Sequence, residues 1–530
     1  MTNLIETTQI KGSLFAALMM GTVIPTLAAA DDVVLKSADG SINLSGELVE
    51  FTDQFYVLRT TLGDLRVSAE RVRCEGDGCP ALEEIDADIV LAGSDTLGQG
   101  LMPLLMQGYA AQIDAEATVT ATANASEVTA AFVGDSGYGE DIGTYLLSST
   151  GSNDAFIKLE DGSAQIGMSS RRITPDEARA LKKSGSGNMI SPSQEHIIAV
   201  DGLVMIVHPS NPLKSLTTDQ VQKIYTGQIT NWSEIGGPNL AVQPVSRGLG
   251  SATRQVFEER MLPDSVSGNM TIAGDNNEVA ALVNAQTGAV GYVGFAFRRG
   301  AKAMPLVNEC GITTAPDSFS AKTEEYALQR RMYLYNRADV SNPMLSGLLD
   351  FAKSSSADGV IRKAGFIDLG IELRAQDTAS VRAVNLNAQN PNSYEGKFAK
   401  EMLEMMGDYA RLSTTFRFRT GSLKLDERGK LDMERLATFV DAQPEGTKIM
   451  MVGFTDDVGA FDANLALSKE RAEAVADQFT AKYPALAERI SIEATGYGEV
   501  APVACNVSDA GRAINRRVEI WLQTTPGLSG

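Results

Sequence analysis

The spacing of apolar and polar positions divides the chain into three folded parts, and strict alternation marks the first. Residues 31–84 contain SINLSGELVEF and QFYVLRTTLGDLRV, in which apolar and polar residues alternate between Gly and Asp turns. A period of two is typical of half-buried β-strands. The pattern predicts a small β-rich N-terminal unit, which serves either as a structural appendage or as a partner-binding unit.

The second part, residues 85–370, alternates strands with helices. DADIVLAGSDT predicts a buried strand that ends in a Gly-Ser turn, and the same switch from strand to helix recurs in AVQPVSRGLGSATRQVFEERM. Apolar residues then follow at helical spacing after the first turn; they are Leu97, Leu101, Leu104, Leu105 and Tyr109. Repeated alternation of this kind predicts an α/β domain, and its length suits two lobes.

The third part lies beyond a polar, turn-rich stretch. Residues 371–411 are predicted to be a linker, and residues 412–530 are predicted to form an α+β domain. Ser468 fits the N-cap of a helix in that domain. The helix is expected to bury a side on which apolar residues recur; they are Leu467, Ala472, Val475 and Phe479.

The N-terminus carries a signature of export. Lys11 precedes an apolar stretch from Ser13 to Leu27 that is closed by Ala28-Ala29-Ala30. This arrangement predicts a cleaved signal peptide over residues 1–30. A membrane anchor is the weaker alternative, because the stretch is shorter than the ~20 residues that span a bilayer. The mature chain is expected to be soluble in the periplasm.

Charge and cysteine content exclude some functions. A net charge of −21 argues against nucleic acid as a partner, since such interfaces need basic patches. Cys74 and Cys79 enclose a tight turn and form either a small disulfide or a free pair, and the state of Cys310 and Cys505 stays open. The two histidines, His196 and His208, have no cysteine pair near them, so neither a metal site nor a cofactor is predicted.

Hydroxyl-rich turns in the second part are candidates for anion binding. Each follows a predicted strand, and three of them open a predicted helix; they are Gly93-Ser94-Asp95-Thr96, Gly151-Ser152-Asn153-Asp154, Ile166-Gly167-Met168-Ser169-Ser170-Arg171 and Gly250-Ser251-Ala252-Thr253, with Arg247 just before the last. Helix N-termini carry unsatisfied N–H groups and partial positive charge. Several of them, together with a guanidinium, predict an oxyanion site. Attraction must be local, because the net charge of the chain repels anions.

Together with IYTGQITNWSEIGGP (224–238) and GYVGFAF (291–297), these turns resemble the phosphate-transport substrate-binding proteins of the periplasm. The resemblance implies a two-lobed periplasmic-binding-protein fold that closes over a bound oxyanion, without catalysis. It also implies the ligand-binding residues, which are Ser94, Asp95, Thr96, Leu97, Ser152, Ser170, Arg247, Ser251, Ala252 and Thr253.

Two positions depart from that family. Relatives often have glycine where Ala252 stands, and the added methyl group affects how closely the backbone approaches a ligand. Many relatives have an aspartate at the position of Ser170, where it accepts the proton of hydrogen phosphate and rejects sulfate. Here Asp95 or Asp154 would have to supply that acceptor. Phosphate is therefore the expected ligand, and another tetrahedral oxyanion is the alternative.

The third part carries a second resemblance. GFTDDVGAFDANLALSKERA, GYGE (496–499) and the terminal GRAINRRVEI resemble the C-terminal domain of outer-membrane protein A, over roughly residues 412–523. The resemblance implies non-covalent binding of the peptidoglycan stem peptide. Asp456 would accept the ammonium of diaminopimelate and Arg471 would hold its carboxylate, with Thr455, Asn464 and Leu467 beside them. The alternative is that Asp456 and Arg471 form an ordinary exposed ion pair.

Two other functions compete with an oxyanion receptor fixed to peptidoglycan near the outer membrane. GDSG around Ser136 mimics the nucleophile segment of a serine hydrolase, although both histidines follow it and the α/β pattern does not suit such an enzyme. A cell-envelope scaffold that has lost ligand binding is the other alternative. An ABC permease or an outer-membrane protein is the expected class of partner. Tethering to the wall conflicts with shuttling to a permease, so capture, sensing or envelope organisation is expected.

Overall fold

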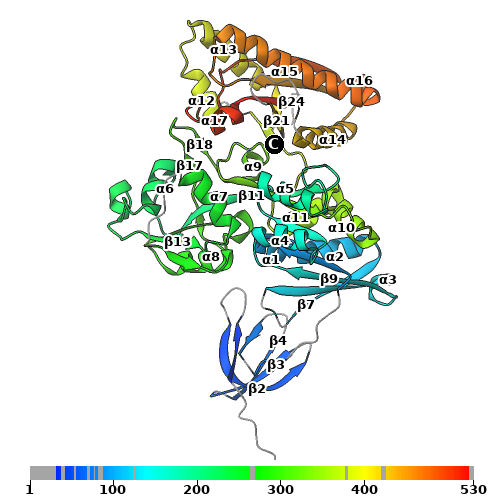
Figure 1. Cartoon of the computed structure of the whole chain (residues 1–530). Helices are drawn as coiled ribbons and strands as arrows, with labels where there is room; N and C mark the ends of the chain where they lie inside the picture. The colour runs from blue at the N-terminus through cyan, green and yellow to red at the C-terminus, as the bar shows by residue number, and fades with distance from the viewer. Residues whose placement is uncertain are drawn as a thin grey trace, which may run out of the picture.

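The structure, a computed structural model, shows an N-terminal β unit, a two-lobed middle domain and a C-terminal domain (Figure 1). It describes residues 32–36, 42–52, 55–61, 63–68, 72–76, 78–80, 87–122, 124, 126–262, 269–376, 380–418, 425 and 427–524. The predicted signal peptide, residues 1–30, lies outside the described residues. Within them, none of the helices has both the length and the apolar character needed to cross a membrane.

The N-terminal unit is an antiparallel sheet with strand order β4-β3-β2-β1-β5. One face of the sheet carries a small core in which Val33, Leu35, Tyr56 and Leu58 are buried, as the alternating pattern predicts. A disulfide joins Cys74 to Cys79, with their Cα atoms 5.8 Å apart. The strands are β1 (Asp32–Lys36), β2 (Asn43–Thr52), β3 (Phe55–Thr60), β4 (Gly63–Ser68) and β5 (Arg73–Glu75).

The first lobe of the middle domain is built on β6, with β9 and β10 pairing parallel to it on either side. Helices pack on this sheet and bury the apolar residues that recur at helical spacing, among them Leu97, Leu101 and Leu105. The elements are β6 (Ile89–Gly93), α1 (Asp95–Gly100), α2 (Met102–Gln112), β7 (Ala115–Ala121), β8 (Glu127–Val133), α3 (Gly134–Gly137), β9 (Asp141–Ser148), α4 (Ser152–Asp161), β10 (Ile166–Ser169), α5 (Pro175–Lys183), α10 (Pro343–Lys353), η4 (Ser355–Ala357) and α11 (Asp358–Lys363).

The second lobe continues the same sheet, whose order β14-β13-β15-β11-β19-β10-β6-β9-β8-β7 runs through both lobes. It has its own core around Trp232, Phe257 and Tyr292. Its elements are β12 (Leu216–Thr217), α6 (Thr218–Tyr225), η2 (Trp232–Ile235), β13 (Gln243–Arg247), α7 (Ala252–Met261), β14 (Thr271–Ala273), α8 (Asn276–Ala285), β15 (Ala289–Gly294), η3 (Phe295–Phe297), β16 (Lys302–Ala303), β17 (Leu306–Val307), β18 (Thr313–Thr314) and α9 (Ser318–Lys322).

Two long strands at the centre of that sheet connect the lobes. Strand β11 (Glu195–Val207) pairs with β19 (Gln329–Asn336) through its first half and with β15 through its second half. A strand that changes partners midway ties each lobe to the other through its backbone. The crossing point therefore lies near Gly202, where pairing with β19 ends and pairing with β15 begins.

The C-terminal domain is a sheet of order β20-β21-β24-β22-β23 covered on both faces. Alternate residues of β22 point to different cores: Ile449 and Met451 to one, Met450 and Val452 to the other. The elements are β20 (Leu373–Ala375), α12 (Val381–Asn387), α13 (Tyr394–Met406), β21 (Tyr409–Arg417), α14 (Glu427–Asp441), β22 (Lys448–Phe454), α15 (Phe461–Lys482), α16 (Pro484–Arg489), β23 (Ser491–Gly496), α17 (Asp509–Asn515) and β24 (Arg517–Gln523).

Two predictions for this part are wrong. Residues 371–411, predicted to be a linker, contain β20, α12 and α13, and Ala399 and Met402 bury themselves against the sheet. Ser468 is not an N-cap, because α15 begins at Phe461. The helix begins two turns earlier than predicted, at Phe461, whose ring packs on Phe398 with ring centroids 5.5 Å apart.

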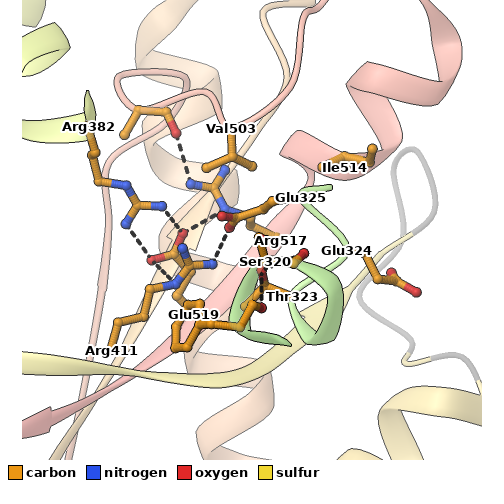
Figure 2. Close-up of polar contacts among 12 residues, drawn as sticks. Ser320, Thr323, Glu324, Glu325, Arg382, Arg411, Val503, Ile514, Arg517 and Glu519 are labelled. Carbon is orange, nitrogen blue, oxygen red and sulfur yellow. Dashed lines mark hydrogen bonds and ion pairs between the residues drawn. The ribbon is translucent and has the colours of Figure 1, made fainter. Parts of the chain in front are cut away.

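The C-terminal domain is docked on the middle domain through a disulfide and a buried network of charges. The disulfide joins Cys310, between β17 and β18, to Cys505. The network centres on Glu519, whose carboxylate accepts hydrogen bonds from Arg382 and Arg517 and lies 3.0 Å from the guanidinium of Arg411. Arg411 also pairs with Glu325 of the middle domain (Figure 2). Glu519, Arg517 and Arg411 are buried, so the ion pair between Arg411 and Glu325 connects the two domains away from bulk water.

Candidate functional site

The first lobe gathers its hydroxyl turns at one edge of the sheet. Strands β6, β9 and β10 run parallel, so their carboxyl ends meet at that edge and the turns that follow lie side by side. Ser94 caps α1 and accepts a hydrogen bond from the backbone N–H of Leu97. Ser152, at the start of α4, accepts the backbone N–H of Ser170 at 3.0 Å, and their hydroxyl oxygens lie 3.2 Å apart.

The second lobe contributes a buried arginine and the N-terminus of α7. Arg247 ends β13 and is only 3% exposed. Its Nη2 donates to Asp95 Oδ2 at 2.6 Å and to the carbonyl of Gly274 at 3.0 Å, whereas Nε and Nη1 are buried without a hydrogen-bond partner in the described structure. Ser251 caps α7, and Thr253 lies in its first turn.

The lobes are closed on each other. The ion pair between Arg247 and Asp95 crosses from one lobe to the other, and Asn276 of α8 donates from Nδ2 to Thr96 Oγ1 at 3.3 Å. Figure 1 shows α1 and α4 facing α7 and α8. Gly151 adopts a φ of 135°, and a Cβ at this position would lie 3.3 Å from the carbonyl oxygen of Gly250. Glycine therefore allows the two turns to approach closely.

Hydroxyl groups of this cluster are set to donate. A hydroxyl has one proton and two lone pairs, and donors of the chain already occupy a lone pair on Thr96, Ser152 and Thr253. The donors are Asn276, the N–H of Ser170 and, for Thr253, the guanidinium of Arg330 at 2.9 Å. Hydroxyls whose lone pairs are engaged in this way are free to direct their protons toward the acceptor oxygens of an anion.

Two further residues predicted to bind the ligand, Leu97 and Ala252, have buried side chains. Leu97 is fully buried in the core, so only its backbone is available near the site. Ala252 is buried at the start of α7. Sequence reasoning missed Asn276 and Arg330, which come from other segments. A signal for Arg330 existed in Asp201, a carboxylate within the apolar stretch 197–207 of β11, where a buried charge requires a partner.

Carboxylates also border the cluster. Asp95 contacts Arg247, and Asp275 caps α8 by accepting the backbone N–H of Glu278. Burial raises the pKa of Asp275, and the charge of Asp95 raises it further, whereas the hydrogen bond from Glu278 and the charge of Arg247 oppose the rise. The site is therefore not uniformly positive, and a ligand that carries a proton would find an acceptor beside the arginine.

The C-terminal domain holds a second cluster, around Asp456. Its Oδ2 accepts a hydrogen bond from Arg516 at 2.6 Å. Arg471 is 1% exposed, and its guanidinium lies 5.4 Å from the centre of the Phe418 ring. Burial lowers the pKa of Arg471, as does the charge of Arg516, whereas Asp456 opposes the shift. Since Asp456 is also buried, the alternative of an ordinary exposed ion pair does not hold.

The neighbouring residues frame this cluster. Thr455 is buried, Asn464 donates to Glu499 at 2.6 Å and to the backbone carbonyl of Asp456 at 3.3 Å, and Leu467 is partly buried. Ser468 accepts the N–H of Gly498 at 3.0 Å, which fastens α15 to the GYGE turn. Sequence reasoning quoted NRRVEI but gave Arg516 no role, because its contact with Asp456 joins residues 60 positions apart.

The other candidate chemistry does not assemble. Ser136 donates to Asp114 at 3.0 Å, while His196 hydrogen-bonds with Asn336 and His208 with Ser210. The serine thus has an aspartate beside it where a hydrolase would need a histidine base. Among the described residues, no group of three or more His, Cys, Asp or Glu side chains is arranged to hold a metal ion.

Comparison with known proteins agrees with both resemblances. The curated relatives include the phosphate-binding protein PstS of Bacillus subtilis, 26% identical over 41% of this chain and 68% of the relative. Protein SphX of Synechococcus elongatus is 28% identical over 35% of this chain and 57% of its own length. Outer membrane porin F of Pseudomonas aeruginosa is 38% identical over 22% of this chain and 32% of its own length.

Among solved structures, an ABC-type phosphate transport receptor from Vibrio cholerae is 25% identical, with a TM-score of 0.39, over 53% of this chain and 99% of its own. Curated relatives that match the middle domain are named as phosphate-binding proteins, in agreement with the prediction that the chain is not an enzyme. The family model of the PBP superfamily domain matches residues 84–355, and that of the OmpA family matches residues 417–516. Because the first model covers just over half of the 530 residues, the chain belongs to the PBP superfamily, and it carries an OmpA-family domain near its C-terminal end.

Proposed function

We propose that the chain is a periplasmic oxyanion receptor, with phosphate as its preferred ligand, held on peptidoglycan by its C-terminal domain. The proposal that the chain binds an anion rests on the environment of Arg247. A buried guanidinium in which two nitrogens, Nε and Nη1, have no hydrogen-bond partner in the described structure is costly unless a ligand satisfies them. Hydroxyls set to donate surround it, and relatives of this domain are named as phosphate-binding proteins.

Asp95 supports phosphate over sulfate. At neutral pH phosphate retains at least one proton, whereas sulfate has none. An ionised carboxylate only accepts hydrogen bonds, so it attracts an anion that can donate and repels one that cannot. Asp95 is 14% exposed on its side chain and touches Arg247. It would thus take over the role that Ser170 cannot fill.

Thermal unfolding tests whether the middle domain binds phosphate. Ligand that binds only the folded state stabilises it by RT ln(1 + [L]/Kd), about 2.7 kcal/mol at a concentration one hundred times Kd. Phosphate should raise the unfolding midpoint of the middle domain, and sulfate at equal ionic strength should raise it less. Equal midpoints with phosphate, sulfate and chloride would leave the envelope scaffold as the better account.

The proposed anchor rests on the Asp456 cluster. Diaminopimelate presents an ammonium and a carboxylate on one carbon, and Asp456 with Arg471 supplies an acceptor and a forked donor. Arg516 holds the Asp456 carboxylate in place. A chain exported to the periplasm and bound there to the wall lies next to the outer membrane. Capture or sensing of the anion fits such a fixed position better than shuttling to a permease.

Arg471→Ala should release the protein from the wall. The variant loses the guanidinium that receives the carboxylate. A charged hydrogen bond contributes roughly 1.5–3 kcal/mol, so the affinity for purified sacculi, measured by sedimentation, should fall at least tenfold. Arg489→Gln, which removes an exposed partner of Asp441 in the same domain, is the control and should sediment like wild type. Equal retention of Arg471→Ala and wild type would show that these residues do not hold the wall.

A further inference from the structure

A second buried arginine stands directly behind the proposed anion site. Arg330, at the start of β19, is 4% exposed, and Asp201 on β11 is fully buried. Arg330 donates from Nε and Nη2 to Asp201 Oδ2 at 3.0 and 2.8 Å. Arg330 makes a third hydrogen bond outside its ion pair with Asp201, in which Nη1 donates to Thr253 Oγ1 at 2.9 Å.

This contact defines what Thr253 is able to do. The guanidinium has no acceptor, so the proton of the Thr253 hydroxyl cannot point toward Arg330 and must point elsewhere. Thr253 lies in the first turn of α7, next to the cap Ser251. The positively charged guanidinium that donates to the Thr253 oxygen also makes this hydroxyl a stronger hydrogen-bond donor. Arg330 thus turns an amphoteric hydroxyl into a fixed donor.

The pair also occupies the crossing between the lobes. Asp201 and Arg330 face each other in the register of β11 and β19, two positions before Leu203, the first residue of β11 that pairs with β15. Asp201 Oδ1 accepts the backbone N–H of Phe295, just after β15, at 2.8 Å. Gly294 leaves room for the pair, because a Cβ there would lie 2.7 Å from Asp201 Oδ2. The group that fixes Thr253 is therefore part of the strands that join the lobes.

Stability alone does not explain the pair. Two charges removed from water are often no more stabilising than apolar side chains of similar size. A positional role does explain why Arg330 divides its donors between a counter-ion and a hydroxyl of the site. The neighbouring Arg331 contrasts with it, because it pairs with Glu324 instead.

We propose that Arg330 is a positioning residue of the anion site: held by Asp201 at the crossing strands, it fixes Thr253 as a hydrogen-bond donor to the bound anion. The inference rests on the proposed function, and it extends the site into the strands that connect the lobes. Arg330 acts through Thr253 and needs no contact with the anion.

A double-mutant cycle on the full-length exported protein tests it, with phosphate affinity measured by calorimetry. Arg330→Met and Thr253→Val should each raise the Kd roughly tenfold, as expected for one charge-assisted hydrogen bond. The double variant should be no weaker than the weaker single variant, because both changes remove one donor. Thr253→Ser, which keeps the hydroxyl, should recover most of the affinity lost in Thr253→Val. Arg331→Met should bind phosphate as wild type does.

The outcomes separate this inference from the proposed function. Losses that multiply in the double variant, or wild-type affinity in Arg330→Met, would overturn the positioning role while leaving the receptor intact. Absence of phosphate binding in wild type would overturn the proposed function and this inference with it. If Arg330→Met does not fold, Arg330→Lys takes its place in the cycle, since lysine keeps the charge beside Asp201 and loses the forked geometry.

Discussion

Replacing Glu519 by glutamine should destabilise the C-terminal domain by about 3–5 kcal/mol, the usual cost of breaking a buried ion network from one side. Glu519 is fully buried and lies between Arg382, Arg411 and Arg517. Without its charge, Arg411 would keep its ion pair with Glu325, whereas Arg382 and Arg517 would lose the carboxylate with which they pair (Figure 2). Trp521 donates to Glu519 at 2.9 Å, so its fluorescence in a Trp232→Phe background would report on the network during urea unfolding.

A matched control comes from the same domain. Glu434 pairs with Lys482 at the surface, where both side chains are about half exposed, and Glu434→Gln should cost less than ~1 kcal/mol. An unfolding midpoint for Glu519→Gln equal to that of the control would show that the network does not hold the domain together.

The same network makes stability depend on pH. Burial raises the pKa of Glu519, but Arg382, Arg411 and Arg517 outweigh it and hold the pKa well below its ordinary value. A lowered pKa contributes stability above the unfolded pKa of about 4.3, and the contribution is lost as the pH falls through the folded value. The difference in unfolding free energy between wild type and Glu519→Gln should therefore be constant near pH 7 and shrink in acid.

Arg247→Ala should weaken phosphate binding by about thirtyfold or more. The change removes the buried N–H groups proposed to receive the anion and leaves Asp95 without its ion-pair partner. Truncating one member of a buried, hydrogen-bonded charge pair costs about 2–5 kcal/mol, roughly thirty- to several-thousandfold in Kd. The affinity of Arg247→Lys for phosphate should lie between those of wild type and Arg247→Ala, because an ammonium keeps the charge but lacks the forked donors of a guanidinium. Calorimetric titration measures each effect.

Arg260→Gln is the control for that titration. Arg260 lies in the last turn of α7, exposed and far along the helix from Ser251. Its loss should leave the affinity for phosphate unchanged. Comparable weakening in Arg260→Gln and Arg247→Ala would mean that general positive charge, and not the buried guanidinium, attracts the anion.

Local pattern predicted the fold well where burial follows a regular period. The switch from strand to helix at Gly93-Ser94 and at Arg247 is encoded by neighbouring residues, and the structure has β6, α1, β13 and α7 there. Residues 371–411 were misjudged because their Asn, Gln and Pro content suggested turns. The apolar positions of α13, such as Ala399 and Met402, become buried only because a sheet formed by later residues lies beneath them.

The site was predictable only in part. The hydroxyls at strand ends and Arg247 can be recognised from the local turns in the sequence. Arg330, in contrast, contacts Thr253 from 77 positions away. Pairings of that kind depend on how β11 and β19 cross, which no local period encodes. Cys310 and Cys505, separated by 195 positions, likewise meet only through the docking of two domains.

The most direct test of the account is a titration of the wild-type, full-length exported protein with phosphate, followed on the same sample by sulfate. The account predicts saturable heat at one site per chain with phosphate and at least tenfold weaker binding of sulfate, since Asp95 repels an anion without a proton. No heat with either anion would contradict the central claim and leave a wall-bound scaffold in its place.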